Sequence, residues 1–317
     1  MNESILKNFI QSLTEVNLQV DVELSGSQFT TYRIGGPIAY CVRLKTKDDL
    51  DSLSRTILNG YKDLLSPKNV CVIGNGSNLL IDDKGFNGIV FVLEDQIGKI
   101  GEIQELPDSK MQVEAGAGLS LPTFARQVMK HEVGGLEFYV GIPGTVGGAV
   151  AMNAGGHGKQ TCDVLKSARA LDLKTGQLKT FSNSECDFRY RASTFKSTDL
   201  VVSAEFIGEK SVQSVIKKNL DDIVTWRREN QPGGRNVGSV FQNPKDVSAG
   251  ALIEKSGLKG FSINGASVSE KHANFIQADQ DAKAKDVSDV IAHVQKVVFE
   301  STGYELKTEV RYISNDE

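Results

Sequence analysis

The chain has 317 residues, too many for one compact core, so we expect two or three lobes with a ligand-binding cleft. Its 36 Lys and Arg residues against 40 Asp and Glu residues give a net charge of −4, which argues against a nucleic-acid partner. No run of 18 apolar residues predicts a membrane span, and the four cysteines and four histidines lack the spacing of a disulfide framework or a metal site. The N-terminus lacks the apolar centre of a signal peptide, so we expect a cytoplasmic protein without a bound metal.

The first predicted element is an amphipathic helix that packs against the first domain. Its apolar residues recur at helical spacing and share one face. These residues are Ile5, Leu6, Phe9, Ile10 and Leu13.

From about residue 29 to 210 the pattern changes to short β-rich runs separated by glycine-rich loops. Gly176 supplies the turn of a predicted β-hairpin, because glycine adopts positive φ without steric cost. The order of elements predicts an α+β domain. The expected strands are 70–73, 88–93, 168–173, 178–181 and 200–207, and the expected helices are 48–59 and 121–131.

A helix at 211–228 is expected to open a second α+β domain. Its apolar positions are Val212, Val215, Ile216, Leu220, Ile223 and Val224. The elements expected after it are helices at 249–255 and 286–300 and strands at 266–269, 274–278 and 306–313.

The 31 glycines gather in four clusters, at 32–37, 74–78, 114–118 and 141–149. The second cluster directly follows an apolar strand, where successive backbone N–H groups suit the oxygens of a pyrophosphate. A single cluster of this kind is most often a tight turn, but four of them favour a binding role. None fits the dinucleotide or P-loop fingerprint, because Leu79 and Leu121 stand where the last dinucleotide glycine belongs and Gln160 follows Lys159.

Several long motifs resemble the UDP-N-acetylenolpyruvoylglucosamine reductase family. They follow one another in order from about residue 29 to residue 313. The motifs are Thr31-Tyr-Arg-Ile-Gly-Gly-Pro37, Gly74-Asn-Gly-Ser-Asn-Leu-Leu80, Gly134-Gly-Leu-Glu-Phe138, the run 141–155, Tyr190-Arg-x-Ser-x-Phe-Lys196, Gly238-Ser-Val-Phe-Gln-Asn-Pro244 and Glu309-Val-Arg311. Residues 268–275 and the short link 208–211 look like the shorter, second type of the family.

The resemblance implies a two-part FAD-binding domain of the vanillyl-alcohol-oxidase (PCMH) type and a smaller C-terminal α+β substrate domain. It implies FAD-binding lobes at about 29–94 and 95–210 and a substrate domain at 211–317, and we assign residues 1–28 to the N-terminal helix expected from the apolar periodicity. The implied reaction is NADPH-dependent reduction of UDP-N-acetyl-3-O-(1-carboxyvinyl)-glucosamine to UDP-N-acetylmuramate for peptidoglycan synthesis. FAD carries the hydride, and NADPH is a co-substrate.

The resemblance also implies roles for individual residues. The catalytic residues are Arg191, Ser239 and Glu309. The cofactor-binding residues are Arg33, Gly74, Asn75, Gly76, Ser77, Asn78, Gly116, Gly118, Ile142, Pro143, Gly144, Thr145, Gly147, Gly148 and Asn153. The residues expected to bind the UDP-sugar are Tyr190, Arg228, Asn243 and Lys271.

These roles agree with the chemistry of the side chains. The arginine presents a planar fork of positive donors to a substrate carboxylate and to the negative charge that develops on it. Glu309 must be protonated or engaged by a cation when substrate is bound, because two carboxylates repel. A neutral serine hydroxyl can protonate an enolate carbon, which is a strong base. Without the resemblance, Ser239 is as readily an ordinary turn or helix-capping residue. For Glu309, spacing alone favours a surface strand residue.

The sequence departs from the family at two positions. Gln242 and Asn230 stand where some relatives carry lysine, and Arg227 or Arg228 is the candidate replacement for the lost charge. A solvated helix end is an equally good interpretation of these arginines.

Two other functions remain open on the sequence alone. One is an oxidase of the same superfamily that tethers its flavin covalently through His157. The other is a nucleotide-sugar-binding regulator that performs no turnover.

Overall fold

The computed structural model describes residues 3–315 and confirms an α+β fold. The chain divides into two compact units. Unit 1 comprises Met1–Val22, Tyr40–Asn75 and Gly88–Thr225, and unit 2 comprises Glu23–Ala39, Gly76–Asn87 and Trp226–Glu317. Within residues 3–315, none of the helices combines the length and apolar character that a membrane crossing requires.

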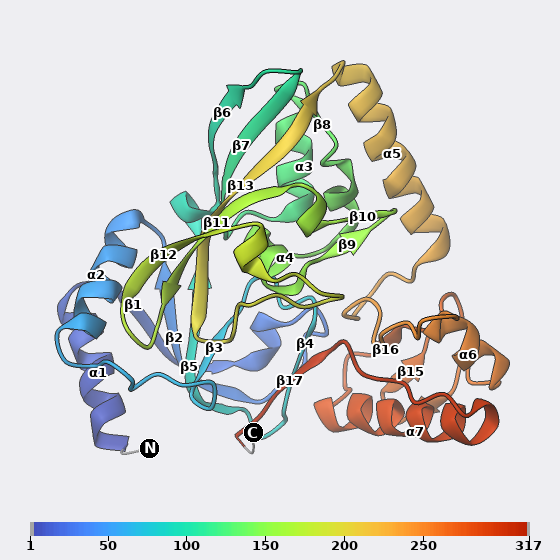
Figure 1. Cartoon of the computed structure of the whole chain (residues 1–317). Helices are drawn as coiled ribbons and strands as arrows, with labels where there is room; N and C mark the ends of the chain where they lie inside the picture. The colour runs from blue at the N-terminus through green and yellow to red at the C-terminus, as the bar shows by residue number, and fades with distance from the viewer. Residues whose placement is uncertain (1–2, 316–317) are drawn as a thin grey trace. The chain divides into compact units, whose positions relative to one another are not determined.

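The first lobe of unit 1 joins two neighbouring helices to a four-stranded sheet in the order β1-β2-β5-β3 (Figure 1). Its elements are α1 (Glu3–Glu15), β1 (Gln19–Ser25), β2 (Pro37–Leu44), α2 (Lys47–Leu58), β3 (Val70–Val72) and β5 (Phe86–Leu93). The predicted N-terminal helix forms over Glu3–Glu15 and buries Leu6, Phe9 and Leu13 in the lobe's core, but the segment 1–28 assigned to it also contains the strand β1. The assignment of Ile5 to that face is wrong, because its side chain is 44% exposed.

The second lobe of unit 1 is built on a sheet in the order β12-β11-β13-β7-β6, with β8 also paired to β13. Helices α3 and α4 lie against this lobe (Figure 1) and bury their apolar side chains in its core. The predicted hairpin is confirmed, since β11 and β12 pair and Gly176 has a φ of 74°. The elements are β6 (Ile100–Glu105), β7 (Lys110–Gly116), α3 (Leu121–Met129), β8 (Val133–Gly134), α4 (Val146–Met152), β9 (Gly155–Gly156), β10 (Lys159–Gln160), β11 (Leu165–Asp172), β12 (Gln177–Ser182) and β13 (Asp199–Lys210).

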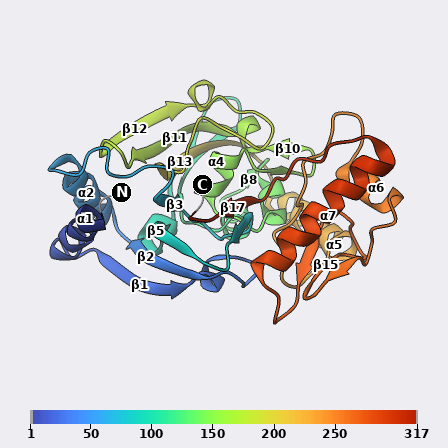
Figure 2. The same cartoon turned by 90° about the horizontal axis from the view of Figure 1, so that it is seen from below.

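Unit 2 packs α6 and α7 with a small antiparallel sheet in the order β14-β15-β16, and Figure 2 shows α7 lying along this sheet. A second pair, β4 (Leu79–Ile81) and β17 (Arg311–Ile313), is parallel and joins segments far apart in the chain. The other elements are α6 (Ala249–Lys255), β14 (Ser262–Ile263), β15 (Ala266–Val268), β16 (Ile276–Ala278) and α7 (Ala284–Thr302).

Two sequence-based expectations need correction. Helix α5 (Gln213–Asn230) forms as predicted, but only Ile216 and Leu220 are buried, while Val212 is 64% exposed. The helix therefore packs along a narrow stripe. The apolar periodicity of its sequence predicts a wider buried face than the structure shows. The expected strand 306–313 shortens to Arg311–Ile313, because its partner β4 offers only three residues for pairing.

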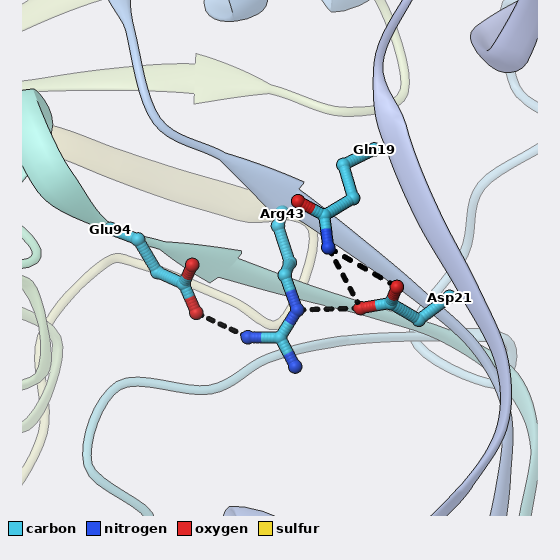
Figure 3. A network of polar contacts seen from close by, with 4 residues as sticks. All are labelled: Gln19, Asp21, Arg43 and Glu94. Atoms are coloured by element: carbon cyan, nitrogen blue, oxygen red, sulfur yellow. Dashed lines mark hydrogen bonds and ion pairs between the residues drawn. The ribbon is translucent and has the colours of Figure 1, made fainter.

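A polar network ties three neighbouring parts of the first lobe together (Figure 3). Arg43 on β2 donates to Asp21 on β1, with 2.6 Å between Nε and Oδ2, and also pairs with Glu94 after β5. Gln19 donates a further hydrogen bond to Asp21 at 3.2 Å. The hydrogen bonds from Arg43 and Gln19 hold the pKa of Asp21 below its usual value.

Replacing Asp21 with asparagine is expected to lower the free energy of unfolding near pH 7 by up to about 1 kcal/mol. Because the pKa of Asp21 is lower in the folded state, its contribution is complete above pH of about 4 and is lost as the pH falls further. The difference from the wild type should therefore shrink below that pH. Thermal unfolding from pH 7 to pH 3 measures this, with Asp51→Asn on exposed α2 as the control. A difference that stayed constant with pH would contradict the assignment.

Candidate functional site

The loop at residues 74–77 follows β3 and exposes backbone donors. Among the described residues, its four consecutive N–H groups make no hydrogen bond. Gly76 has a φ of 62°, and a Cβ there would lie 1.8 Å from the Phe29 carbonyl oxygen, so the turn requires glycine. A run of unpaired amides around a left-handed residue forms a concave site for phosphate oxygens.

Parts of three of the four glycine clusters meet within unit 1. Asn75 Nδ2 donates to the carbonyl oxygen of Pro143 at 2.9 Å, and a Cβ on Gly74 would lie 2.3 Å from Thr145 Oγ1. Gly147 donates its N–H to Ala117, between Gly116 and Gly118, at 2.8 Å. The loops predicted to bind the cofactor are therefore neighbours in space, held together by contacts that need small residues.

Helix α4 begins where these loops meet. Thr145 is its N-cap, and its Oγ1 accepts the N–H of Gly148 at 3.3 Å. Before it, Gly144 accepts the N–H of Leu121, and Ile142 is half-buried at the start of the loop. The helix ends at Asn153, which adopts a left-handed conformation with a φ of 43°.

Replacing Gly74 with alanine is expected to displace the Thr145 side chain from its capping position. Loss of an N-cap costs about 1 kcal/mol, and a loop shift of this kind should weaken FAD binding roughly fivefold to tenfold. Fluorescence titration with FAD and thermal unfolding measure both effects. Gly156→Ala is the control, since the nearest atom to its Cβ would be 4.0 Å away. Equal FAD affinity in both variants would contradict a role for this contact.

Gly116 lines a cavity of about 310 Å³ between α2 and the second-lobe sheet. Apolar and charged side chains both line its wall. The apolar lining includes Leu50, Ile97, Ile100, Leu171, Leu178 and Val202, and the charged lining includes Lys47, Lys99, Glu114 and Arg169. The cavity can therefore hold a flat ring with polar edges.

Arg191 lies in a tight turn of unit 1 in which Arg189 and Ala192 exchange backbone hydrogen bonds. Its φ is 54°, an uncommon conformation for a side chain of this size. The half-buried guanidinium donates from Nη2 to the Gly155 carbonyl oxygen at 3.3 Å and lies 5.2 Å from the Tyr190 ring centroid. These contacts hold a fixed cation beside the C-terminal end of α4.

Asn153 supports this turn through its side chain. It donates to the Arg189 carbonyl oxygen at 3.1 Å and to Gln160 Oε1 at 3.3 Å, and it accepts the N–H of Cys162 at 3.0 Å. Both amide protons are used, and the residue is 2% exposed. The structure thus shows Asn153 bracing the turn that carries Arg191.

Ser239 lies in an extended segment at the centre of unit 2. It forms a β-bridge with Phe275, and the next residue, Val240, accepts the N–H of Glu309 at 2.7 Å. The backbones of Ser239 and Glu309 are thereby neighbours. The half-buried Ser239 hydroxyl makes no hydrogen bond in the part of the chain that the structure describes, so its proton and lone pairs are available to a ligand.

The other predicted cofactor residues of unit 2 lie in two places. Asn78 donates from Nδ2 to the Glu309 carbonyl oxygen at 3.0 Å and accepts the N–H of Arg311 at 3.0 Å, so it holds the segment that leads from Glu309 into β17. Ser77 is half-buried in the loop before it, whereas Arg33 is exposed in a turn with a φ of 56°.

Two of the predicted substrate-binding residues of unit 2 are in contact. Lys271 Nζ donates to the Arg228 carbonyl oxygen at 2.5 Å, and both side chains are exposed. Asn243 accepts the Ala249 N–H at 3.0 Å through Oδ1, which leaves its amide N–H groups available.

Sequence reasoning missed Asn274, whose amide holds the Ser239 segment. Its Oδ1 accepts the N–H of Phe241 at 2.9 Å, and its Nδ2 donates to the Phe241 carbonyl oxygen at 2.8 Å. The only available signal was the run 268–275, which served to identify the family subtype. Beside it, burial lowers the pKa of His272, whose Nδ1 accepts the Asn274 N–H at 3.2 Å.

Comparisons with known proteins match two regions of the chain to two domain families. Residues 64–182 match the model of an FAD binding domain, and residues 230–313 match the C-terminal domain of UDP-N-acetylenolpyruvoylglucosamine reductase. The reductase of that name from Clostridioides difficile (strain 630) is 36% identical over 317 residues and 99% of both chains. The one from Protochlamydia amoebophila (strain UWE25) is 39% identical and covers 91% of this chain and 92% of its own.

Solved structures extend the comparison to the fold. The crystal structure of UDP-N-acetylenolpyruvylglucosamine reductase from Thermus caldophilus superposes with a TM-score of 0.77 at 28% identity, over 94% of this chain and 100% of that one. Physcomitrella patens BBE-like 1 matches with a TM-score of 0.54 at 12% identity, over 92% of this chain and 88% of its own, and shows a likeness of fold alone. These matches support the two-part FAD-binding domain of the PCMH type with a smaller C-terminal α+β domain.

Proposed function

The chain belongs to the UDP-N-acetylenolpyruvoylglucosamine reductase family and is an FAD-dependent oxidoreductase. From this premise we propose that it uses NADPH to reduce UDP-N-acetyl-3-O-(1-carboxyvinyl)-glucosamine to UDP-N-acetylmuramate. The observation that carries the proposal is the Ser239 hydroxyl, which lies on a braced segment beside the backbone of Glu309 and makes no competing hydrogen bond among the described residues. The product would serve peptidoglycan synthesis in the cytoplasm, and thereby cell shape and division.

The residues present fit an FAD molecule. The unpaired N–H groups of residues 74–77 and the loop 142–148 are the proposed pyrophosphate site, with Gly116 and Gly118 beside them. The cavity at Gly116 lies near the N-terminal end of α4, because the next residue, Ala117, accepts the N–H of Gly147. Arg191 lies near the C-terminal end of α4, where it donates to the Gly155 carbonyl oxygen. We therefore assign the cavity to the adenosine part. When bound, the flavin supplies hydride transfer from the nicotinamide to the substrate.

The protein's own groups serve the second half of the reaction. Arg191 binds the substrate carboxylate through its planar fork and stabilises the negative charge that develops there as hydride reaches the β carbon. Ser239 Oγ gives its proton to the α carbon of the resulting enolate. Glu309 completes the carboxylate site in its protonated or cation-paired form.

The remaining residues bind the rest of the substrate. Tyr190, Arg228, Asn243 and Lys271 are proposed to contact the UDP-sugar, with the two cations facing its diphosphate. In this proposal residues 29–210 serve FAD, residues 211–317 serve the substrate, and residues 1–28 pack on the first lobe. The subtype is proposed to be the shorter, second type.

The decisive test mixes purified protein with NADPH and the enolpyruvyl substrate and follows NADPH absorbance. We expect substrate-dependent loss of absorbance and formation of UDP-N-acetylmuramate. Unchanged absorbance would instead indicate a nucleotide-sugar-binding regulator. Acid denaturation should release all of the flavin, and yellow colour retained on the precipitated chain would indicate a covalent oxidase anchored at His157.

A further inference from the structure

We propose that Asn274 is the positioning residue for Ser239, an inference that rests on the proposed function and assigns the support of its proton donor. Asn274 does not contact the Ser239 hydroxyl. It acts on the backbone two residues further along, where it holds Phe241 in place.

The Ser239 segment is held on two sides. On one side, Val240 accepts the Glu309 N–H at 2.7 Å and Gln242 donates to the Lys307 carbonyl oxygen at 2.9 Å. This antiparallel pairing leaves the N–H and carbonyl groups of Phe241 facing the other way. Phe241 is 1% exposed, so water cannot satisfy those groups.

The Asn274 amide supplies the missing partners. Its carbonyl oxygen and its NH₂ group pair with Phe241 at 2.9 and 2.8 Å, and its main-chain oxygen accepts the Val240 N–H at 2.8 Å. A carboxamide can do this because it carries a donor and an acceptor, as a peptide group does. The side chain thus supplies the two hydrogen bonds that a residue of a neighbouring β-strand would make with Phe241, and it fixes the segment that carries Ser239.

Asn274→Asp tests this role because protonation of the introduced carboxyl group decides whether it can donate to the Phe241 carbonyl oxygen. An ionised carboxylate accepts the Phe241 N–H but cannot donate to the carbonyl oxygen, whereas a protonated one restores both bonds. Burial disfavours the charged form, so the introduced carboxyl should protonate above its usual pKa. We expect reoxidation of reduced FAD by substrate to be slowed about tenfold at pH 8 and to recover as the pH falls to about 6. Reduction of FAD by NADPH should change less than about twofold at either pH.

Each rate is compared with the wild type at the same pH, because other groups near Asn274 also titrate. His272 accepts its N–H, Glu270 and Lys271 flank that histidine, and Glu254 and Lys259 influence its pKa. Gln277→Glu is the matched control, since it removes an amide donor to Gly233 in the same unit. We expect it to show no pH-dependent loss of reoxidation.

Asn274→Ser is the second variant, in case the aspartate does not fold at pH 8. Its single, shorter side-chain oxygen cannot take the positions of both Oδ1 and Nδ2, and it has no titrating group, so reoxidation should be slow at every pH. Normal reoxidation in both variants, or equal slowing of both half-reactions, would overturn the inference. If the wild type failed to oxidise NADPH with substrate, the proposed function itself would fail.

Discussion

Replacing Ser239 with alanine is expected to leave reduction of the flavin by NADPH unchanged while its reoxidation by the enolpyruvyl substrate falls by at least about a hundredfold. The loss is large because a positioned general acid typically contributes about 10²- to 10⁴-fold. Hydride transfer from NADPH needs no protonation of the substrate, so the first half-reaction should be unaffected.

Anaerobic stopped-flow measurements separate the two steps through the flavin absorbance. Ser262→Ala, on the exposed face of β14, is the control within the same unit. Thermal unfolding should show both variants folded, since the Ser239 hydroxyl makes no hydrogen bond within the described residues. Slow flavin reduction in Ser239→Ala would assign the serine to the nicotinamide step.

Local elements of the fold could be predicted from the sequence because their causes are local. The hairpin of β11 and β12 follows from Gly176 between two apolar runs, and α2 begins at a capping box formed by Thr46 and Asp49. The loop at 74–78 was recognisable because its glycines follow an apolar strand.

Long-range pairing could not be predicted, because it depends on tertiary packing. Strand β17 pairs with β4, more than two hundred residues away, and Thr308, just before it, bridges Phe241 instead of extending the strand. Helical periodicity likewise predicted that α5 is a helix, but it did not predict that most of its apolar side chains are not buried.

The candidate site shows the same limit at the level of single side chains. The resemblance implied that Asn78 and Asn153 bind the cofactor, yet their amides hold the backbones near Glu309 and Arg191. An amide that binds a ligand and one that replaces a backbone partner look identical in sequence, because the difference lies in what packs around them. Asn274 was missed for this reason.

Arg191→Lys is expected to slow flavin reoxidation by substrate about tenfold, and Arg191→Ala about a hundredfold, with flavin reduction by NADPH unchanged. Lysine keeps the positive charge but loses the planar fork that can bind both oxygens of a carboxylate. It also loses the hydrogen bond to Gly155 and the placement of the guanidinium over Tyr190. The difference in reoxidation rate between the lysine and alanine variants therefore measures the contribution of the positive charge. The difference between the wild type and the lysine variant measures the contribution of the guanidinium geometry.

Arg189→Lys is the matched control for these variants. Arg189 lies in the same turn, but its side chain is 66% exposed and reaches Asp187 only at 3.4 Å, so its geometry should matter little. A deficit confined to flavin reduction would place Arg191 at the nicotinamide. An equal loss in Arg189→Lys would show that the turn as a whole, and not the Arg191 guanidinium, determines the rate.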